Sequence, residues 1–189
     1  MEKPYRKIAI FGGSFDPPHL GHLEIMKKAL ETLDVDRLFV VPARLSPFKK
    51  GHAAPGELRL EWLRKMTTFD PRIEVSDLEL KKEGPSYTID TVEAFAPLAE
   101  TIYLIVGADN LKGLKRWHRY DELNRRVRWV VATRDDEPIP PGFLRLEVEA
   151  PISSTELRRR IDPRWIPEPI REEVVQFYRH KRESGKERD

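Results

Sequence analysis

The sequence contains no cysteine, a single glutamine (Gln176) and two asparagines (Asn110 and Asn124). The absence of cysteine excludes disulfide bonds and cysteine-based zinc sites. No apolar run reaches the roughly 18 residues that a transmembrane helix needs, and the chain has no hydrophobic leader. We therefore expect a soluble, cytoplasmic protein that does not bind membranes.

The charges are nearly balanced, because 34 Lys and Arg residues stand against 32 Asp and Glu residues. The formal net charge of +2 gives no indication of nucleic-acid binding, although the sequence pI of 8.8 is mildly basic. Charged residues make up 35% of the chain, and this share, together with the few amide side chains, is typical of thermophile proteins. The sequence does not indicate an oligomeric state.

Apolar segments typical of buried strands alternate with amphipathic segments typical of helices. The predicted strands are residues 8–11, 38–41, 73–75, 102–106, 127–132 and 144–148. The predicted helices between them are residues 20–33, 57–68, 88–96 and 120–126. This alternation predicts an α/β fold, a doubly wound, Rossmann-like parallel sheet that binds ligands at the carboxyl ends of its strands.

The last part of the chain has a different pattern, with two predicted helices at residues 153–161 and 168–182. A chain of 189 residues is long enough to bury about 70% of its unfolded surface in one domain. We expect this domain to cover residues 1–182, with a sheet core at about 5–150 and a C-terminal helical part at about 151–182. Residues 183–189 have no apolar period, so we expect a frayed tail.

The segment GGSFDPPHLGH (residues 12–22) directly follows the first predicted strand. Gly12 and Gly13 would let the backbone turn sharply and approach a ligand closely. Asp16, followed by two prolines, would start a helix whose free N–H groups point back at the turn. The segment therefore predicts an anion site.

His19 and His22 are three residues apart, so on a helix they share one face of the first turn and can donate to the same phosphate. The same segment is also typical of a simple tight turn between a strand and a helix. The two histidines could instead bind a metal together with Glu24. The zinc-binding helix has its histidines four residues apart, which disfavours that alternative.

Two later segments carry further polar groups. Ser-Ser-Thr at residues 153–155, with Arg158 one turn on, is typical of a capped helix start that forms a second anion site. The alternative is a plain capping box with Glu156. Asp109 follows a predicted strand and Gly107, where an acid holds a ribose hydroxyl in nucleotide-binding folds or caps the next helix.

GGSFDPPHLGH resembles the signature of the nucleotidyltransferases that share an HxGH motif with class I aminoacyl-tRNA synthetases. Within this group, the chain is similar to the bacterial nicotinate-nucleotide adenylyltransferases. Further segments agree in order and spacing over nearly the whole chain, namely Val40-Val41-Pro42 with Pro47-Phe48-Lys49, GPSYT at 84–88, GADNL at 107–111 with Trp117, and ISSTELR at 152–158. The sequence departs from the family at residues 133–136, where only Arg134 of the usual Arg-Pro-Gly is retained.

The resemblance implies transfer of the adenylyl group of ATP to nicotinate mononucleotide, giving deamido-NAD and pyrophosphate in NAD biosynthesis. The mononucleotide phosphate would attack the ATP α-phosphate in line, so the protein supplies positioning and donors rather than a nucleophile. Mg²⁺ is the expected cofactor. It would be held mainly by the substrate phosphates, since the sequence contains no metal-binding motif.

The resemblance also assigns site residues. The expected catalytic residues are His19, His22 and Arg158. The expected ATP-binding residues are Gly12, Gly13, Ser14, Phe15, His19, His22, Gly107, Asp109, Ser153, Ser154, Thr155 and Arg158. The expected residues for nicotinate mononucleotide are Ser14, Phe15, Lys49, Tyr87, Thr88 and Trp117.

Two assignments for the second substrate also have a physical reason. Thr88 opens a predicted helix, whose free amides would favour a carboxylate over a neutral carboxamide. Trp117 lies in a polar stretch, which favours a stacking surface for a flat pyridine ring over a core position. Trp62, Trp129 and Trp165 lie in apolar periods, and we expect them in the core.

Other functions stay open at this point. The sister transferases that act on nicotinamide mononucleotide, pantetheine phosphate or glycerol phosphate share the HxGH turn, but the segments around Thr88 and Trp117 disfavour the last two. The alternatives that are not enzymes are a nucleotide sensor and a nucleic-acid binder using basic runs such as residues 158–160.

Overall fold

The computed structural model describes residues 2–44, 53–134 and 138–186 of the chain. Its strands are β1 (Tyr5–Gly13), β2 (Arg37–Pro42), β3 (Ile73–Val75), β4 (Ala99–Gly107), β5 (Arg128–Thr133) and β6 (Leu144–Glu147). Its α-helices are α1 (Leu20–Thr32), α2 (Gly56–Met66), α3 (Leu78–Lys81), α4 (Thr88–Phe95), α5 (Tyr120–Arg126), α6 (Ser154–Arg159) and α7 (Arg171–Lys186). Its 3₁₀ segments are η1 (Ala96–Leu98), η2 (Ala108–Arg116), η3 (Pro163–Trp165) and η4 (Glu168–Ile170).

The strands form one sheet in the order β3-β2-β1-β4-β5-β6, and every neighbouring pair is parallel. This confirms the predicted doubly wound α/β fold. The chain first adds strands on one side of β1 and then crosses to the other side, where β4 pairs with β1. The crossovers diverge at this switch point, so a crevice forms beyond the carboxyl ends of β1 and β4, where such folds bind ligands.

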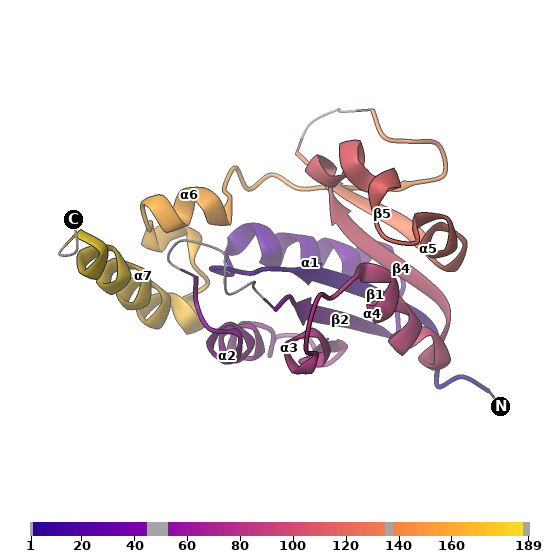
Figure 1. Ribbon diagram of the computed structural model, residues 1–189, viewed down its shortest axis with the longest axis horizontal. Coiled ribbons are helices and arrows are strands. Elements are labelled where there is room, and N and C mark those ends of the chain that lie inside the picture. The colour runs from indigo at the N-terminus through magenta and orange to yellow at the C-terminus, as the bar shows by residue number, and fades with distance from the viewer. Residues whose placement is uncertain (1, 45–52, 135–137, 187–189) are drawn as a thin grey trace.

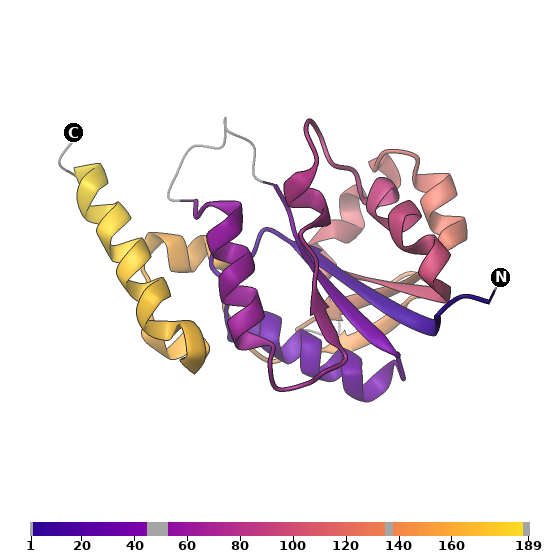
Figure 2. The same cartoon turned by 90° about the horizontal axis from the view of Figure 1, so that it is seen from below.

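The two faces of the sheet are covered because successive side chains of a strand point in opposite directions. Ala9 and Phe11 of β1 belong to a buried cluster with α1 and α2, whereas Ile8 and Ile10 belong to a second cluster with α4 and α5. Figure 2 shows α1 on one side of the sheet and α4 and α5 on the other. The continuous apolar runs in the sequence arise from this two-sided burial.

The C-terminal helical part packs beside the sheet core, as the sequence predicts. Helix α7 lies alongside α2, at the end of the molecule opposite the start of β1 (Figures 1 and 2). Glu173 ties the two helices together, because its carboxylate accepts hydrogen bonds from Trp62 Nε1 at 3.2 Å and Lys65 Nζ at 2.7 Å. The helix continues to Lys186, beyond the predicted end at residue 182.

Smaller differences concern side chains and one short helix. Trp62 and Trp129 are buried as expected, but Trp165 is only half-buried. Helix α3 was not predicted, because it is a single turn with no buried residue and therefore has no apolar period in the sequence. Within the described residues, we find no helix that combines the length and apolar character needed to cross a membrane.

Candidate functional site

The turn after β1 is built differently from the sequence prediction. Strand β1 runs through Gly12 and Gly13, and the sharp change of direction falls at Phe15, whose φ is 50°. This left-handed conformation costs a bulky residue about 1–2 kcal/mol. Burial of the ring offsets the cost, because it packs edge-on against Phe11 and His22 at centroid distances of 5.3 and 4.8 Å. The ring of Phe15 is therefore buried inside the protein and is not accessible to a ligand.

Two buried ionic side chains hold this turn in place. Arg59 of α2 donates from Nη1 to the main-chain oxygens of Ser14 at 2.8 Å and Ala43 at 2.7 Å. Asp16 is fully buried, and its Oδ1 accepts hydrogen bonds from Ala54 N and the Tyr178 hydroxyl. The prediction that Asp16 starts a helix is wrong, because its carboxylate is used inside the protein and α1 begins at Leu20.

His19 is the N-cap of α1, and the two histidines fix each other through the backbone. The Nδ1 atom of His19 accepts a hydrogen bond from Gly21 N at 3.0 Å, and the Nδ1 atom of His22 accepts one from His19 N at 3.1 Å. Their rings stack with centroids 3.7 Å apart. An imidazole that accepts at Nδ1 carries its proton on Nε2 when it is neutral, so both rings keep an Nε2–H donor for a ligand.

Burial keeps both imidazoles neutral. It lowers the pKa of His19 to about 4, and the positive charge of Arg134 contributes in the same direction. Burial also lowers the pKa of His22, with a further contribution from His19. The two histidines are therefore neutral donors rather than cations.

Gly21 is required by the position of the His19 ring. A Cβ atom at residue 21 would lie 2.8 Å from Cε1 and 2.9 Å from Nδ1 of His19. These separations are too short for any side chain, so the ring can lie over the Gly21 amide only because residue 21 is glycine. The glycine of HxGH therefore sets the orientation of the first histidine.

A cleft of about 940 Å³ contains part of the predicted ATP-binding set, whereas residues 12–15, Thr155 and Arg158 of that set lie outside its lining. It is lined by His19 and His22 at the start of α1, by the segment after β4, by the segment after β5 and by the residues leading into α6. The predicted site residues in this lining are His19, His22, Gly107, Asp109, Ser153 and Ser154. Segments from four places in the sequence therefore share one cavity.

Asp109 presents an exposed carboxylate at this cleft. The N-cap of η2 is Gly107, with no side-chain cap bond, so the alternative that Asp109 caps the helix is wrong. A Cβ atom at residue 107 would lie 2.6 Å from Asp109 Oδ1. The glycine therefore leaves room for the carboxylate.

Helix α6 starts at the lining of this cleft and contacts the turn after β1. Ser153 is its N-cap and accepts a hydrogen bond from Glu156 N at 3.2 Å, as predicted. Ser154 Oγ donates to Pro17 O at 2.9 Å, and Arg158 Nη1 donates to Asp16 O at 2.8 Å. Arg158 also donates to Thr155 Oγ1 at 3.2 Å. These bonds hold the second predicted anion site against the first.

Three of the residues predicted for nicotinate mononucleotide, Tyr87, Thr88 and Trp117, lie at or near the start of α4 and outside the lining of this cleft. Helix α4 begins at Thr88 as predicted, with the exposed Tyr87 as N-cap and no side-chain cap bond. Tyr87 stacks on His118 at a centroid distance of 4.2 Å, which brings this helix start next to the Trp117 segment. Trp117 is half-buried and packs edge-on against Trp129 at 6.1 Å. The predicted Lys49 and part of the 133–136 segment lie outside the described residues.

Several residues of the site were missed by sequence reasoning. The Glu24 carboxylate accepts hydrogen bonds from Glu149 N at 2.6 Å and Ala150 N at 3.0 Å and so fixes one wall of the cleft. Among the described residues, no three histidine or acidic side chains gather as metal ligands. Lys112 and Arg134 add two positive charges to the lining.

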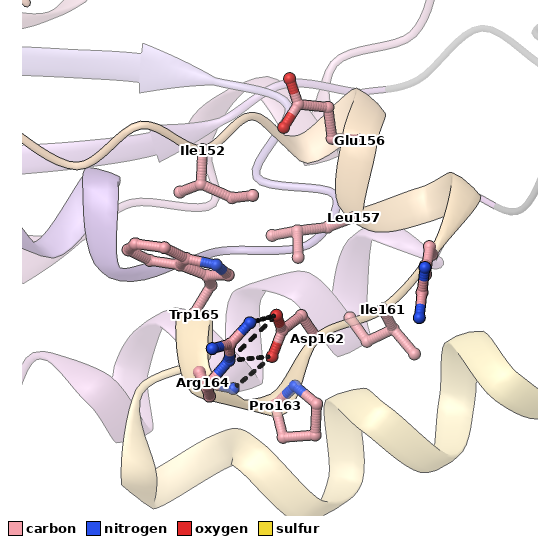
Figure 3. A pocket seen from close by; sticks show the side chains of 9 residues that line it. Ile152, Glu156, Leu157, Ile161, Asp162, Pro163, Arg164 and Trp165 are labelled. Carbon is pink, nitrogen blue, oxygen red and sulfur yellow. Dashed lines mark hydrogen bonds and ion pairs between the residues drawn. The ribbon is translucent and has the colours of Figure 1, made fainter.

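A second cavity of about 550 Å³ lies on another side of α6. Its walls combine apolar side chains, including Leu157 and Trp165, with the Asp162–Arg164 ion pair at 2.8 Å (Figure 3). None of the predicted site residues that the structure describes lines this cavity. Of these two cavities, the larger cleft is therefore the one that contains predicted site residues.

Comparison with known proteins places these features in a family context. The profile of the cytidylyltransferase-like family matches residues 10–160. The chain is 47% identical over 177 residues to the probable nicotinate-nucleotide adenylyltransferase of Nitratiruptor sp., covering 92% of this chain and 99% of that protein. It is 44% identical over 172 residues to the protein of the same description from Sulfurimonas denitrificans, covering 91% and 94%.

The fold is shared with solved structures. The Plasmodium falciparum nicotinic acid mononucleotide adenylyltransferase, solved in complex with NaAD, superposes with a TM-score of 0.72 at 20% identity, covering 92% of this chain and 96% of that one. The crystal structure of a protein described as a putative nicotinate-nucleotide adenylyltransferase, from Vibrio parahaemolyticus, gives a TM-score of 0.65 at 19% identity, with the same coverage. At these identities the likeness supports the fold.

The low pKa of His19 predicts how stability changes with pH. The unfolded chain binds a proton at this side chain near its ordinary value of 6.5, whereas the folded chain binds it only near 4. Stability from this group is therefore complete above about pH 6.5 and is lost as the pH falls toward 4. Between about pH 7.5 and pH 5, we expect a loss of about 2 kcal/mol in the free energy of unfolding.

Denaturant unfolding of the wild type and of His19→Asn over this pH range measures the difference, and NMR titration of the imidazole gives its pKa directly. The variant should lose the part of this pH dependence that His19 contributes and keep the part that comes from His22, whose pKa is also lowered by burial. An His19 pKa at or above 6.5 would contradict the prediction.

Proposed function

The chain belongs to the cytidylyltransferase-like family and, within it, to the nicotinate-nucleotide adenylyltransferases, and we propose that the cleft between α1 and α6 is where it joins ATP to nicotinate mononucleotide. The reaction transfers the adenylyl group of ATP to the mononucleotide phosphate and forms nicotinate adenine dinucleotide and pyrophosphate, a step of NAD biosynthesis. The observation that carries this assignment is the pair of neutral histidines, each with Nδ1 bonded to backbone and Nε2–H left for a phosphate.

The chemistry requires donors more than it requires a nucleophile. A phosphate oxygen of the mononucleotide attacks the α-phosphorus of ATP, the new P–O bond forms, and the bond to the bridging oxygen breaks as pyrophosphate leaves. The attacking phosphate is already ionised, so no proton has to be removed from it. The barrier is the repulsion between anions, and fixed N–H donors lower it without reorganising during the reaction.

The two sides of the cleft would divide the phosphates of ATP. His19 and His22 would donate to the transferring α-phosphate, with His22 nearest to it. Ser153 and Ser154 in the lining would hold the leaving β- and γ-phosphates, together with Thr155 and Arg158, which follow on α6 just outside the lining. Support comes from the bonds of Ser154 and Arg158 to the turn after β1, since these fix the two donor sets relative to one another.

Mg²⁺ fits this arrangement as an ion carried by the substrate. The exposed carboxylate of Asp109 lies at the cleft, and the gathering of ligands needed for a protein-only cage is missing from the described residues. The ion would therefore be held by ATP phosphates and water. When bound, it neutralises the charge that develops on the leaving pyrophosphate.

The acceptor is the acid form of the mononucleotide. The start of α4 at Tyr87 and Thr88 has amides with no side-chain cap, and a helix start favours a carboxylate by charge as well as by hydrogen bonding. A carboxamide gains less, because its NH₂ group is itself a donor. The half-buried indole of Trp117 would stack on the pyridine ring of either form.

The proposed function predicts pyrophosphate release from ATP and Mg²⁺ with nicotinate mononucleotide, and much less with nicotinamide mononucleotide. Trp117→Ala should lower catalytic efficiency for both substrates, by an amount equal to about 1–3 kcal/mol of stacking, and leave their ratio nearly unchanged. The test is to measure the catalytic efficiency of the wild type and of Trp117→Ala with each of the two mononucleotides. Equal efficiencies in the wild type would contradict selection by the backbone, and a collapse of the ratio in the variant would assign it to the indole.

His22 should act on the chemical step more than on binding, because a donor aimed at the transferring phosphate strengthens as charge develops. Removing such a donor typically costs about 10²–10³ in turnover. We expect this loss for His22→Ala in kcat measured at saturating ATP and mononucleotide. Unchanged kcat with a raised KM would show that His22 contributes to binding only.

A further inference from the structure

Tyr178 connects the C-terminal helix to the turn after β1. It lies on α7 and is buried, with its ring near that of Trp62. Its hydroxyl donates to Oδ1 of Asp16, and the same oxygen accepts from Ala54 N at 2.9 Å. A residue near the end of the chain thus supplies a hydrogen bond to the segment that precedes the two histidines.

The other side of the Asp16 carboxylate faces Arg158. Oδ2 is buried and has no hydrogen-bond partner in the described part of the chain. The Nη1 atom of Arg158 lies 4.0 Å from Oδ2 while it donates to the main-chain oxygen of the same residue at 2.8 Å. Arg158 is therefore attracted to this carboxylate without forming a hydrogen bond with it.

A buried carboxylate is costly unless its oxygens are bonded. The hydroxyl of Tyr178 supplies part of the compensation, and burial together with the charge of Asp16 raises its pKa well above the ordinary value, so it remains a donor. If the hydroxyl were removed, the carboxylate would recover the lost interaction most directly from Arg158, since closing the 4.0 Å gap turns this long ion pair into a hydrogen-bonded one. That pair would compete with ATP for the same guanidinium.

We propose that Tyr178 is a positioning residue for ATP: by bonding Asp16, it keeps Arg158 available to the leaving phosphates. The inference rests on the proposed function, because it takes ATP as the ligand of Arg158. It assigns to the C-terminal helix a part in substrate binding, although α7 supplies no residue to the lining of the cleft.

Tyr178→Phe removes the hydroxyl and keeps the ring. We expect the KM for ATP to rise about tenfold, a size typical of losing one hydrogen bond to a charged group, while kcat and the KM for nicotinate mononucleotide change less than about twofold. In an Arg158→Ala background, the same substitution should have no further effect on the KM for ATP, because the competing guanidinium is gone.

Glu173→Gln is the matched control. It weakens another attachment of α7, to Trp62 and Lys65 on α2, without touching Asp16. It should lower the unfolding temperature and leave the KM for ATP unchanged. A rise of the same size in this control would mean that any loosening of α7 has the effect, and would overturn the inference.

Asp16→Asn tests the inference even if Tyr178→Phe does not fold, since it removes the charge that attracts Arg158. It should lower the KM for ATP, and a raised KM would contradict the proposal.

Additive effects of Tyr178→Phe and Arg158→Ala on the KM for ATP, or an unchanged KM for ATP in folded Tyr178→Phe, would also overturn the proposal. If the wild type released no pyrophosphate from ATP and nicotinate mononucleotide, the proposed function would fail before this inference was tested.

Discussion

The contact between the His19 ring and the backbone of residue 21 is the constraint on which the site depends. Because residue 21 has no side chain, the ring can lie over the Gly21 amide and accept its hydrogen bond. The main chain of His19 then donates to His22, so one steric condition sets the proton position of both rings. Burial keeps the rings neutral, and the result is two fixed Nε2–H donors.

These donors are useful only because the sheet places them beside the other charged groups. The switch between β1 and β4 opens the crevice, and α6 is tied to the turn after β1 by Ser154 and Arg158. Inside the protein, Arg59 and Asp16 hold this turn with buried hydrogen bonds, while the ring of Phe15 offsets a strained backbone. These buried residues thus fix the shape of the cleft without contacting a ligand themselves.

The sequence predicts most of the fold because strands buried on both faces and amphipathic helices leave clear periods. It also predicts the histidine pair, the Ser153 cap and the start of α4, since these follow from short-range spacing. It does not predict that Phe15 takes the left-handed turn, nor that Tyr178 bonds Asp16, because such contacts depend on how distant segments pack. The role of Arg59 could be predicted only in part. A basic residue on the apolar face of α2 indicates a buried, bonded side chain, but the sequence does not show which groups it bonds.

The most direct test of the account is the turnover of Gly21→Ala, compared with Gly113→Ala as a control. A Cβ atom at residue 21 displaces the His19 ring, whereas one at residue 113 meets nothing within 4 Å. At saturating ATP and nicotinate mononucleotide, we expect Gly21→Ala to lose about 10² in kcat while its helical circular dichroism is retained, and Gly113→Ala to keep wild-type kcat. Wild-type kcat in Gly21→Ala would contradict the claim that this backbone contact sets the catalytic donors.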